Sequence, residues 1–165
     1  GVIGIISPWN FPVQLTFGPL ADVLAAGNRC IIKPSEFTPA TSALMARMIR
    51  EAFSEEEIAV VTGGAETGAA FSAMPFDHLL FTGATSVARH VMRAAAENLV
   101  PVTLELGGKS PNILFADSDV EKAVKRGVFG CFYNSGQSCN APTRMLVERS
   151  IYDRVLEIAK TTGES

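Results

Sequence analysis

The stretch HLLFTGATSVAR, residues 78–89, joins a short apolar run to a glycine and then to a helical pattern. The run 78–82 is typical of a buried strand, and we expect Gly83 to open a helix that continues to about residue 99. A strand followed directly by a helix is the repeating unit of a parallel sheet. This stretch therefore predicts an α/β fold.

The same alternation continues along the whole chain. Because most of the strand runs are apolar throughout, they predict a parallel sheet covered by helices on both faces. We expect Asp119 to cap one of the helices. Strands are predicted at 2–6, 29–33, 58–62, 78–82, 102–106, 112–116 and 143–148, and helices at 12–26, 39–53, 65–73, 83–99, 119–133 and 151–161.

The composition predicts a soluble globular chain. Of its 165 residues 47% are hydrophobic and 19% are charged, with a formal net charge of −3. There is no basic block for nucleic acid and no apolar run of the ~20 residues that span a membrane. The start GVIGIISPWN lacks both an initiator Met and a positive segment, which predicts a central piece of a longer protein.

Three cysteines, Cys30, Cys131 and Cys139, are an odd number without a CxxC pair. This pattern argues against a disulfide framework or a structural metal site and favours a reducing, cytoplasmic compartment. Cys30 and Cys131 fall in a predicted strand and helix, where buried, unreactive thiols are expected. Cys139 follows Gly136 in NSGQSCNAPTR, a small and polar run that predicts an exposed loop and an accessible nucleophile.

The candidate catalytic and ligand-binding residues lie directly after the predicted strands. Because ligands of parallel sheets bind beyond the carboxyl ends of the strands, this placement predicts one cleft. The residues are Asn10, Lys33, Glu36, Gly83 and Glu105.

Each of these residues has a functional and a structural interpretation. Asn10, between two prolines, can donate to an oxyanion or satisfy its own loop. Lys33 and Glu36 can bind ribose hydroxyls, favouring NAD over NADP, or form a solvated surface pair. Glu105, in apolar surroundings, can act as a general base or pair with Lys109.

Five motifs in one order, PWNFP, KPSE, FTG, LELGGK and GQSC, resemble the aldehyde dehydrogenase superfamily across essentially all 165 residues. The segments VPVTLELGGKSPNI and NSGQSCNAP are similar to those of the class 3 and coniferyl-aldehyde branch. The resemblance implies a Rossmann-like dinucleotide-binding domain over residues 1–107 and the start of an α/β catalytic domain over residues 108–165. It also implies a homo-oligomer that oxidises a small-molecule aldehyde. The lack of a basic block and of a membrane-spanning run predicts that the chain binds neither nucleic acid nor membrane.

The resemblance assigns roles to individual residues. Cys139 would attack the aldehyde, Asn10 and the Cys139 N–H would hold the oxyanion, and Glu105 would activate the hydrolytic water. Hydride would pass to NAD, with NADP as an alternative, and no metal is implied. The cofactor-binding positions implied are Lys33, Glu36, Gly83, Trp9, Ala84 and Leu106.

The chain also departs from the family pattern. Ala84, Ser86 and Ala88 stand where the family commonly has Ser, Glu and Gly, which removes one hydroxyl contact to the cofactor. The chain ends soon after Cys139, so we expect it to be inactive on its own.

Several interpretations remain open from the sequence. The whole protein could be a semialdehyde or acylating dehydrogenase, or a non-catalytic nucleotide-binding protein on the same scaffold. Phe17, Phe132 and Tyr133 could line a tunnel for an aromatic or long-chain aldehyde, or belong to the core.

Overall fold

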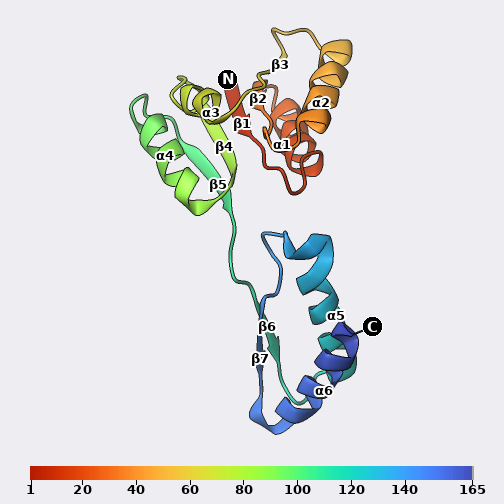
Figure 1. Ribbon diagram of the computed structural model, residues 1–165. Helices are drawn as coiled ribbons and strands as arrows, with labels where there is room; N and C mark the ends of the chain where they lie inside the picture. Colours follow the sequence, from red (N-terminus) through yellow and green to blue (C-terminus); the bar gives the residue numbers. More distant parts are fainter. Residues whose placement is uncertain (165) are drawn as a thin grey trace. The chain divides into compact units, whose positions relative to one another are not determined.

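A computed structural model describes residues 1–164, which form two compact units that meet in sequence between Leu106 and Gly107 (Figure 1). The first unit contains five strands and four helices, and the second contains two strands and two α-helices. Assigning these units to a dinucleotide-binding and a catalytic domain stays a prediction at this point. Among the described residues, no helix is both long and apolar enough to cross a membrane.

The first unit is built on a five-stranded sheet in the order β3-β2-β1-β4-β5, with every neighbouring pair parallel. The predicted parallel α/β fold is confirmed. The chain first moves outward from β1 to β3 and then crosses back to β4, so the order reverses between β1 and β4. The strands are β1 (Val2–Ile6), β2 (Arg29–Lys33), β3 (Ile58–Val60), β4 (His78–Gly83) and β5 (Val102–Leu106).

Two helices cover each face of this sheet (Figure 1). On one face, α1 (Gln14–Ala25) and α2 (Pro39–Ala52) enclose a core that includes Ile5. On the other face, α3 (Ala65–Ser72) and α4 (Thr85–Ala96) enclose a core that includes Ile6. Successive residues of β1 therefore point into opposite cores, as expected for a central parallel strand.

β5 departs from the prediction that the strands are covered on both faces. Val102, Leu104 and Leu106 pack toward the α4 side, whereas Thr103 and Glu105 are exposed. β5 is the edge strand, and α1 and α2 pack over β1, β2 and β3 rather than over β5. Its second face is therefore open to solvent in this structure.

The second unit contains a parallel pair, β6 (Pro111–Leu114) and β7 (Arg144–Val147), with α5 (Val120–Phe132) and α6 (Tyr152–Gly163). Short 3₁₀ turns, η1 (Tyr133–Gly136) and η2 (Arg149–Ile151), follow α5 and precede α6. Asp119 caps α5 as predicted, accepting a hydrogen bond from the Lys122 N–H at 3.3 Å. The buried core of this unit is formed by Leu114, Val120, Val124 and Val155.

Several element boundaries differ from the predicted ones. α4 begins at Thr85 with Ala84 as its N-cap, not at Gly83, because β4 continues through Gly83 to pair with Leu106. The same helix ends at Ala96, and Leu99 adopts a left-handed conformation with φ of 55°. Hydrophobic patterning locates an element well but does not encode these backbone details.

Gly127 allows α5 to approach β6 closely. A Cβ at this position would collide with the side-chain amide of Asn112 and lie 3.1 Å from Met145 Cε. Gly130, on the same helix, is different, because a Cβ there would make an ordinary contact of 3.5 Å with Pro142 Cγ.

We expect Gly127→Ala to lower the thermal unfolding midpoint of the whole protein, because overpacking a buried contact costs about 1–3 kcal/mol. Gly130→Ala is the matched control and should leave the midpoint unchanged or raise it, since alanine favours a helix by about 0.5–1 kcal/mol over glycine. Equal midpoints for the two variants would contradict this account of the helix–strand contact.

Candidate active site

The carboxyl ends of four strands meet at one edge of the first sheet. Ile6 is in register with Lys33 on β2 and with Phe81 on β4, and Gly83 is in register with Leu106 on β5. In open parallel sheets, ligands bind at this edge, beside the point where the strand order reverses. The first unit thus brings the segments after β1, β2, β4 and β5 to one edge.

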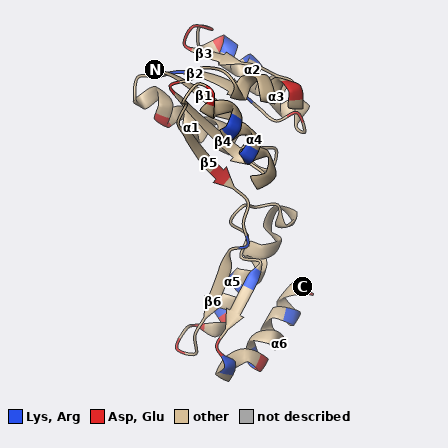
Figure 2. Ribbon diagram, turned by 90° about the vertical axis from the view of Figure 1, so that its left-hand side faces the viewer, with Lys and Arg blue, Asp and Glu red and all other residues tan. Residues whose placement is uncertain are grey.

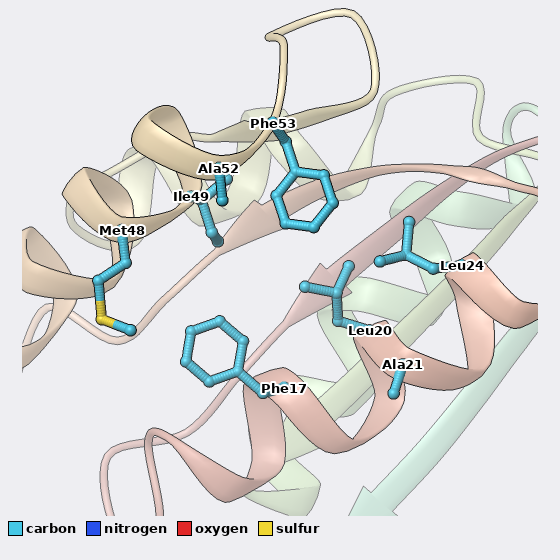
Figure 3. Close-up of a pocket in the computed structure, with 8 residues that line it drawn as sticks. All are labelled: Phe17, Leu20, Ala21, Leu24, Met48, Ile49, Ala52 and Phe53. Atoms are coloured by element: carbon cyan, nitrogen blue, oxygen red, sulfur yellow. The ribbon is translucent and has the colours of Figure 1, made fainter.

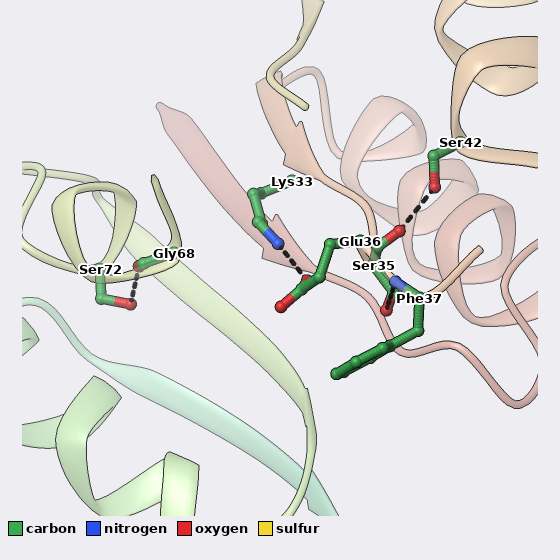
Figure 4. A network of polar contacts seen from close by, with 7 residues as sticks. All are labelled: Lys33, Ser35, Glu36, Phe37, Ser42, Gly68 and Ser72. Atoms are coloured by element: carbon green, nitrogen blue, oxygen red, sulfur yellow. Dashed lines mark hydrogen bonds and ion pairs between the residues drawn. The ribbon is translucent and has the colours of Figure 1, made fainter. Parts of the chain in front are cut away.

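Lys33 and Glu36 form an ion pair at the end of β2 (Figure 4). Lys33 Nζ lies 2.8 Å from Glu36 Oε2, and the side chains are 4% and 37% exposed. The hydrogen bond from Lys33 lowers the pKa of Glu36, which therefore stays ionised at neutral pH. The interpretation of a fully solvated surface pair is wrong, because the ammonium is buried while the carboxylate still reaches solvent.

The segment after β4 provides the start of α4. Ala84 is its exposed N-cap and makes no side-chain capping hydrogen bond, so the first-turn N–H groups are not capped by that residue. Such N–H groups and the positive end of the helix dipole suit an anionic group. Gly83 also has a packing reason, because a Cβ there would lie 2.6 Å from Phe81 Cζ.

Asn10 and Trp9 lie on the loop between β1 and α1. Asn10 is half-buried and Trp9 is 44% exposed. Asn10 has an interaction partner, so the structure leaves both interpretations of its side chain open. Sequence reasoning missed Ser7 and Thr16, two buried hydroxyl residues that flank this loop.

Glu105 is exposed on the open face of β5. The expectation of mostly apolar surroundings is wrong for this structure, because the alternating pattern of an edge strand turns Glu105 away from the α4-side core. Figure 2 marks this acidic position on β5 in red. The carboxylate is therefore exposed to solvent in this structure.

Cys139 is exposed, as predicted, on the loop between α5 and β7. Three consecutive residues before it, Asn134, Ser135 and Gly136, have left-handed φ values of 51°, 57° and 73°. Such a run is rare outside glycine and forms a sharp turn at the end of α5. This turn redirects the chain so that the thiol lies on a loop rather than on the helix.

The Cys139 loop lies against the segment that opens the second unit. A Cβ on Gly108 would lie 3.8 Å from the Cys139 carbonyl oxygen, and Arg144 Nε donates to the Lys109 carbonyl at 2.8 Å. Gly108 and Lys109, at the end of LELGGK, thus lie near the segment that carries GQSC, although the two motifs are distant in sequence. The sequence indicates that the glycines after Glu105, Gly107 and Gly108, allow close backbone approach, whereas Arg144 was not singled out because its role depends on this tertiary contact.

The three cysteines have different environments. Burial raises the pKa of Cys30 to about 12, which makes it an inert core thiol. Cys131 is half-buried on α5, so the expectation of a fully buried residue is wrong. The outward-facing residues of α5 near its end include Phe132, 67% exposed, and this part of the helix is only partly covered. Cys139 is the exposed member of the set.

An apolar groove of about 270 Å³ lies between α1 and α2, away from the strand ends (Figure 3). Phe17 lines it and also packs on the core beneath, whereas Phe132 and Tyr133 are exposed and do not belong to a core. None of the predicted catalytic or cofactor-binding residues lines this groove. The groove lining consists of Phe17, Leu20, Ala21, Leu24, Met48, Ile49, Ala52 and Phe53.

Comparison with known proteins agrees with this arrangement. The model of the aldehyde dehydrogenase family matches residues 1–165. The chain belongs to the aldehyde dehydrogenase family. It is 66% identical over 146 residues to a probable coniferyl aldehyde dehydrogenase of Caulobacter vibrioides, a match that covers 88% of this chain and 30% of the relative. It is 57% identical over 153 residues to coniferyl aldehyde dehydrogenase of a Pseudomonas species, covering 93% and 32%.

Solved structures of aldehyde dehydrogenases share the fold. An aldehyde dehydrogenase C variant of Pseudomonas syringae, in complex with NAD+ and octanal, matches with a TM-score of 0.93 and 39% identity over 100% of this chain and 35% of that one. A substrate-bound aldehyde dehydrogenase of Staphylococcus aureus matches with a TM-score of 0.92 and 44% identity over 98% and 35%. The chain thus spans about a third of the length of the relatives it matches.

The three residues of this aldehyde dehydrogenase chain that depart from the family pattern all lie at the start of α4. Ala88 is 2% exposed and packs in the core beneath α4, so its methyl group fills space there. Ala84 and Ser86 are exposed in the first turn of α4. The backbone donors of that turn are retained although the common hydroxyl is missing.

We expect the Lys33–Glu36 pair to stabilise the protein in a pH-dependent way. Because the folded-state pKa of Glu36 is lowered, its contribution is present above the unfolded value of about 4.3 and disappears as the pH falls through the lower folded value. The difference in unfolding free energy between wild type and Glu36→Gln should therefore shrink between pH 7 and about pH 3. Urea titrations at each pH would measure it. Glu55→Gln, on the exposed turn before β3, is the control, and an equal change for both variants would contradict the prediction.

Proposed function

We propose that the whole protein oxidises an aldehyde to the carboxylic acid with NAD, using Cys139 as the covalent nucleophile. The observation that carries this proposal is the exposed Cys139 in an aldehyde dehydrogenase chain whose other described cysteines are buried or half-buried. We assign residues 1–107 to the dinucleotide-binding domain and residues 108–165 to the start of the catalytic domain.

The proposed chemistry begins with thiol addition. The Cys139 thiolate forms a C–S bond to the carbonyl carbon, and the carbonyl oxygen becomes an oxyanion. The Asn10 amide and the Cys139 backbone N–H would donate to that oxyanion, each contributing about 3–4 kcal/mol to transition-state stabilisation. NAD, when bound, supplies the acceptor for the hydride that leaves the former carbonyl carbon, and a thioester remains on Cys139.

Hydrolysis of the thioester completes the proposed cycle. Glu105 takes a proton from a water molecule that attacks the thioester carbon, the C–S bond breaks, and the acid leaves with the Cys139 thiolate restored. The exposure of Glu105 supports access by water. Asn10 and Glu105 belong to the first unit and Cys139 to the second.

The first unit has features that fit NAD. The Glu36 carboxylate, ionised and partly exposed beside a buried Lys33, suits the two hydroxyls of an adenosine ribose. The first turn of α4, after Gly83 and Ala84, suits the pyrophosphate, with Trp9 and Leu106 at the same sheet edge. A 2′-phosphate would face the Glu36 charge, so we propose a preference for NAD, with NADP as the weaker cofactor.

We propose an aromatic or long-chain aldehyde, such as coniferyl aldehyde, as the substrate. Two relatives at 66% and 57% identity carry that name, and an octanal complex is among the structural matches. We further propose that the protein is cytoplasmic, since a catalytic thiol must stay reduced. From its family we also propose that it is a homo-oligomer. A semialdehyde or acylating dehydrogenase is the second candidate. A semialdehyde enzyme would prefer a charged substrate, and an acylating enzyme would transfer the acyl group of the thioester to an acceptor other than water.

We expect Cys139→Ala to lower aldehyde-dependent reduction of NAD by at least about 10³-fold, because the covalent step is lost. Absorbance at the NADH band, with coniferyl aldehyde, octanal and a charged semialdehyde, measures it in the whole protein. Cys131→Ala is the matched control and should stay close to wild type. If wild type reduces neither NAD nor NADP with any of these aldehydes, the protein is a non-catalytic binding protein and the proposal fails.

We expect Glu105→Gln to separate the two halves of the reaction. The first turnover should still release about one equivalent of NADH per active site, whereas steady turnover should fall by about 10²–10⁴-fold through loss of the base. Rapid-mixing measurements of NADH resolve the two phases. Glu97→Gln, an exposed glutamate at the end of α4, is the control. Loss of the first turnover itself would contradict the role given to Glu105, and rapid turnover restored by coenzyme A would favour the acylating alternative.

A further inference from the structure

Two buried hydroxyl groups close the loop that carries Asn10. Thr16 on α1 is 0% exposed and Ser7, directly after β1, is 3% exposed. Thr16 Oγ1 lies 2.7 Å from Ser7 Oγ and 2.6 Å from the Pro12 carbonyl oxygen. One side chain thus contacts both ends of the segment 7–12.

The direction of these hydrogen bonds follows from the available protons. A carbonyl oxygen only accepts, so the single hydroxyl proton of Thr16 is donated to Pro12. Ser7 must then donate its own proton to Thr16 Oγ1. Ser7 therefore donates to Thr16, and Thr16 donates to the Pro12 carbonyl, so each hydroxyl has one defined acceptor.

Other contacts restrict the same loop. The Ser7 N–H donates to the Lys33 carbonyl at 3.2 Å, which fixes the start of the loop to β2. The Leu15 N–H donates to the Phe11 carbonyl at 3.0 Å, which fixes its end to α1. Pro8 and Pro12 restrict the backbone on either side of Asn10. With both ends fixed, the backbone at Asn10 has little freedom to shift.

Stability alone does not explain a buried hydroxyl pair. Replacing two hydrogen-bonded groups by apolar groups of similar shape is often nearly neutral for folding, whereas losing one partner leaves the other unsatisfied. A directed pair does give something that an apolar contact lacks, namely a defined distance between the two ends of a loop. An oxyanion donor needs that kind of definition, because a displacement of about 1 Å can cost about 10²-fold in rate.

We propose that Thr16 and Ser7 are positioning residues that hold the Asn10 loop in the geometry for oxyanion stabilisation. The proposal rests on the proposed function, since it assumes that Asn10 is an oxyanion donor. The two residues would act through the loop rather than through their own side-chain contacts with the aldehyde or the cofactor.

The test compares Thr16→Val, which keeps the side-chain shape and removes the hydroxyl, with Asn10→Ala in the whole protein. We expect Thr16→Val to lower kcat/KM for the aldehyde by about tenfold or more, and Asn10→Ala by about 10²–10³-fold. In the Asn10→Ala background, Thr16→Val should cause no further loss, because its effect passes through Asn10. The KM for NAD should stay within about twofold of wild type in each variant.

Two further variants separate positioning from general destabilisation. Ser72 is the matched control: it is 3% exposed, and its hydroxyl donates to the Gly68 carbonyl four residues earlier at 2.8 Å, as Thr16 does to Pro12 (Figure 4). Ser72→Ala should lower the unfolding midpoint but leave kcat/KM near wild type. Thr16→Ser, which retains the hydroxyl, should recover most of the activity lost in Thr16→Val. If Thr16→Val does not fold, Ser7→Ala provides the same comparison.

The outcomes distinguish the two proposals. If wild type oxidises no aldehyde, the proposed function fails and the positioning role fails with it. If wild type is active but Thr16→Val and Ser7→Ala match it, only the positioning role is overturned. The role is also overturned if Thr16→Val costs as much in the Asn10→Ala background as in wild type, since it would then act elsewhere.

Discussion

The parallel pairing of β1 with both β2 and β4 is the constraint on which the rest of the first unit depends. Ile5 points into the α1–α2 core and Ile6 into the α3–α4 core, so a one-residue slip of β1 would exchange the two buried faces. With that register fixed, Ile6 aligns with Lys33 and Phe81. The loops that follow three different strands then begin at the same edge of the sheet, which is why residues distant in sequence can serve one ligand.

Much of this arrangement could be predicted from the sequence, because apolar runs and strand–helix alternation encode which elements form. The exposure of Glu105 was missed, although VTLEL alternates apolar and polar residues as a strand with one open face does. That β5 is the edge strand, with no helix over that face, is what the sequence did not show. The partial burial of Cys131 likewise depends on what covers α5. Thr16 was missed because a threonine in the first turn of a helix carries no signal until its partners Ser7 and Pro12 are known.

The division between Leu106 and Gly107 leaves the proposed cofactor-binding residues and the proposed nucleophile in different units. Lys33, Glu36 and the first turn of α4, the groups proposed to bind a dinucleotide, all belong to the first unit. Cys139 lies in the second unit, with its backbone carbonyl near Gly108. The proposed reaction therefore uses residues of both units, whereas the proposed cofactor-binding residues lie in the first.

The two arms of the proposed oxyanion site are held by different physical means. The loop of Asn10 is fixed by buried hydrogen bonds of Ser7 and Thr16. Removing these hydroxyls from water is unfavourable, and their hydrogen bonds offset that desolvation. The loop of Cys139 follows a left-handed run through Asn134 and Ser135, which costs about 1–2 kcal/mol per residue and is supported by the Gln137 N–H donating to the Asn134 carbonyl at 3.0 Å. Without that turn, α5 would continue and carry the thiol along the helix. Strained backbone on one side and a buried hydroxyl pair on the other are both unfavourable locally, and both make sense where a defined position of a donor or nucleophile matters more than local stability.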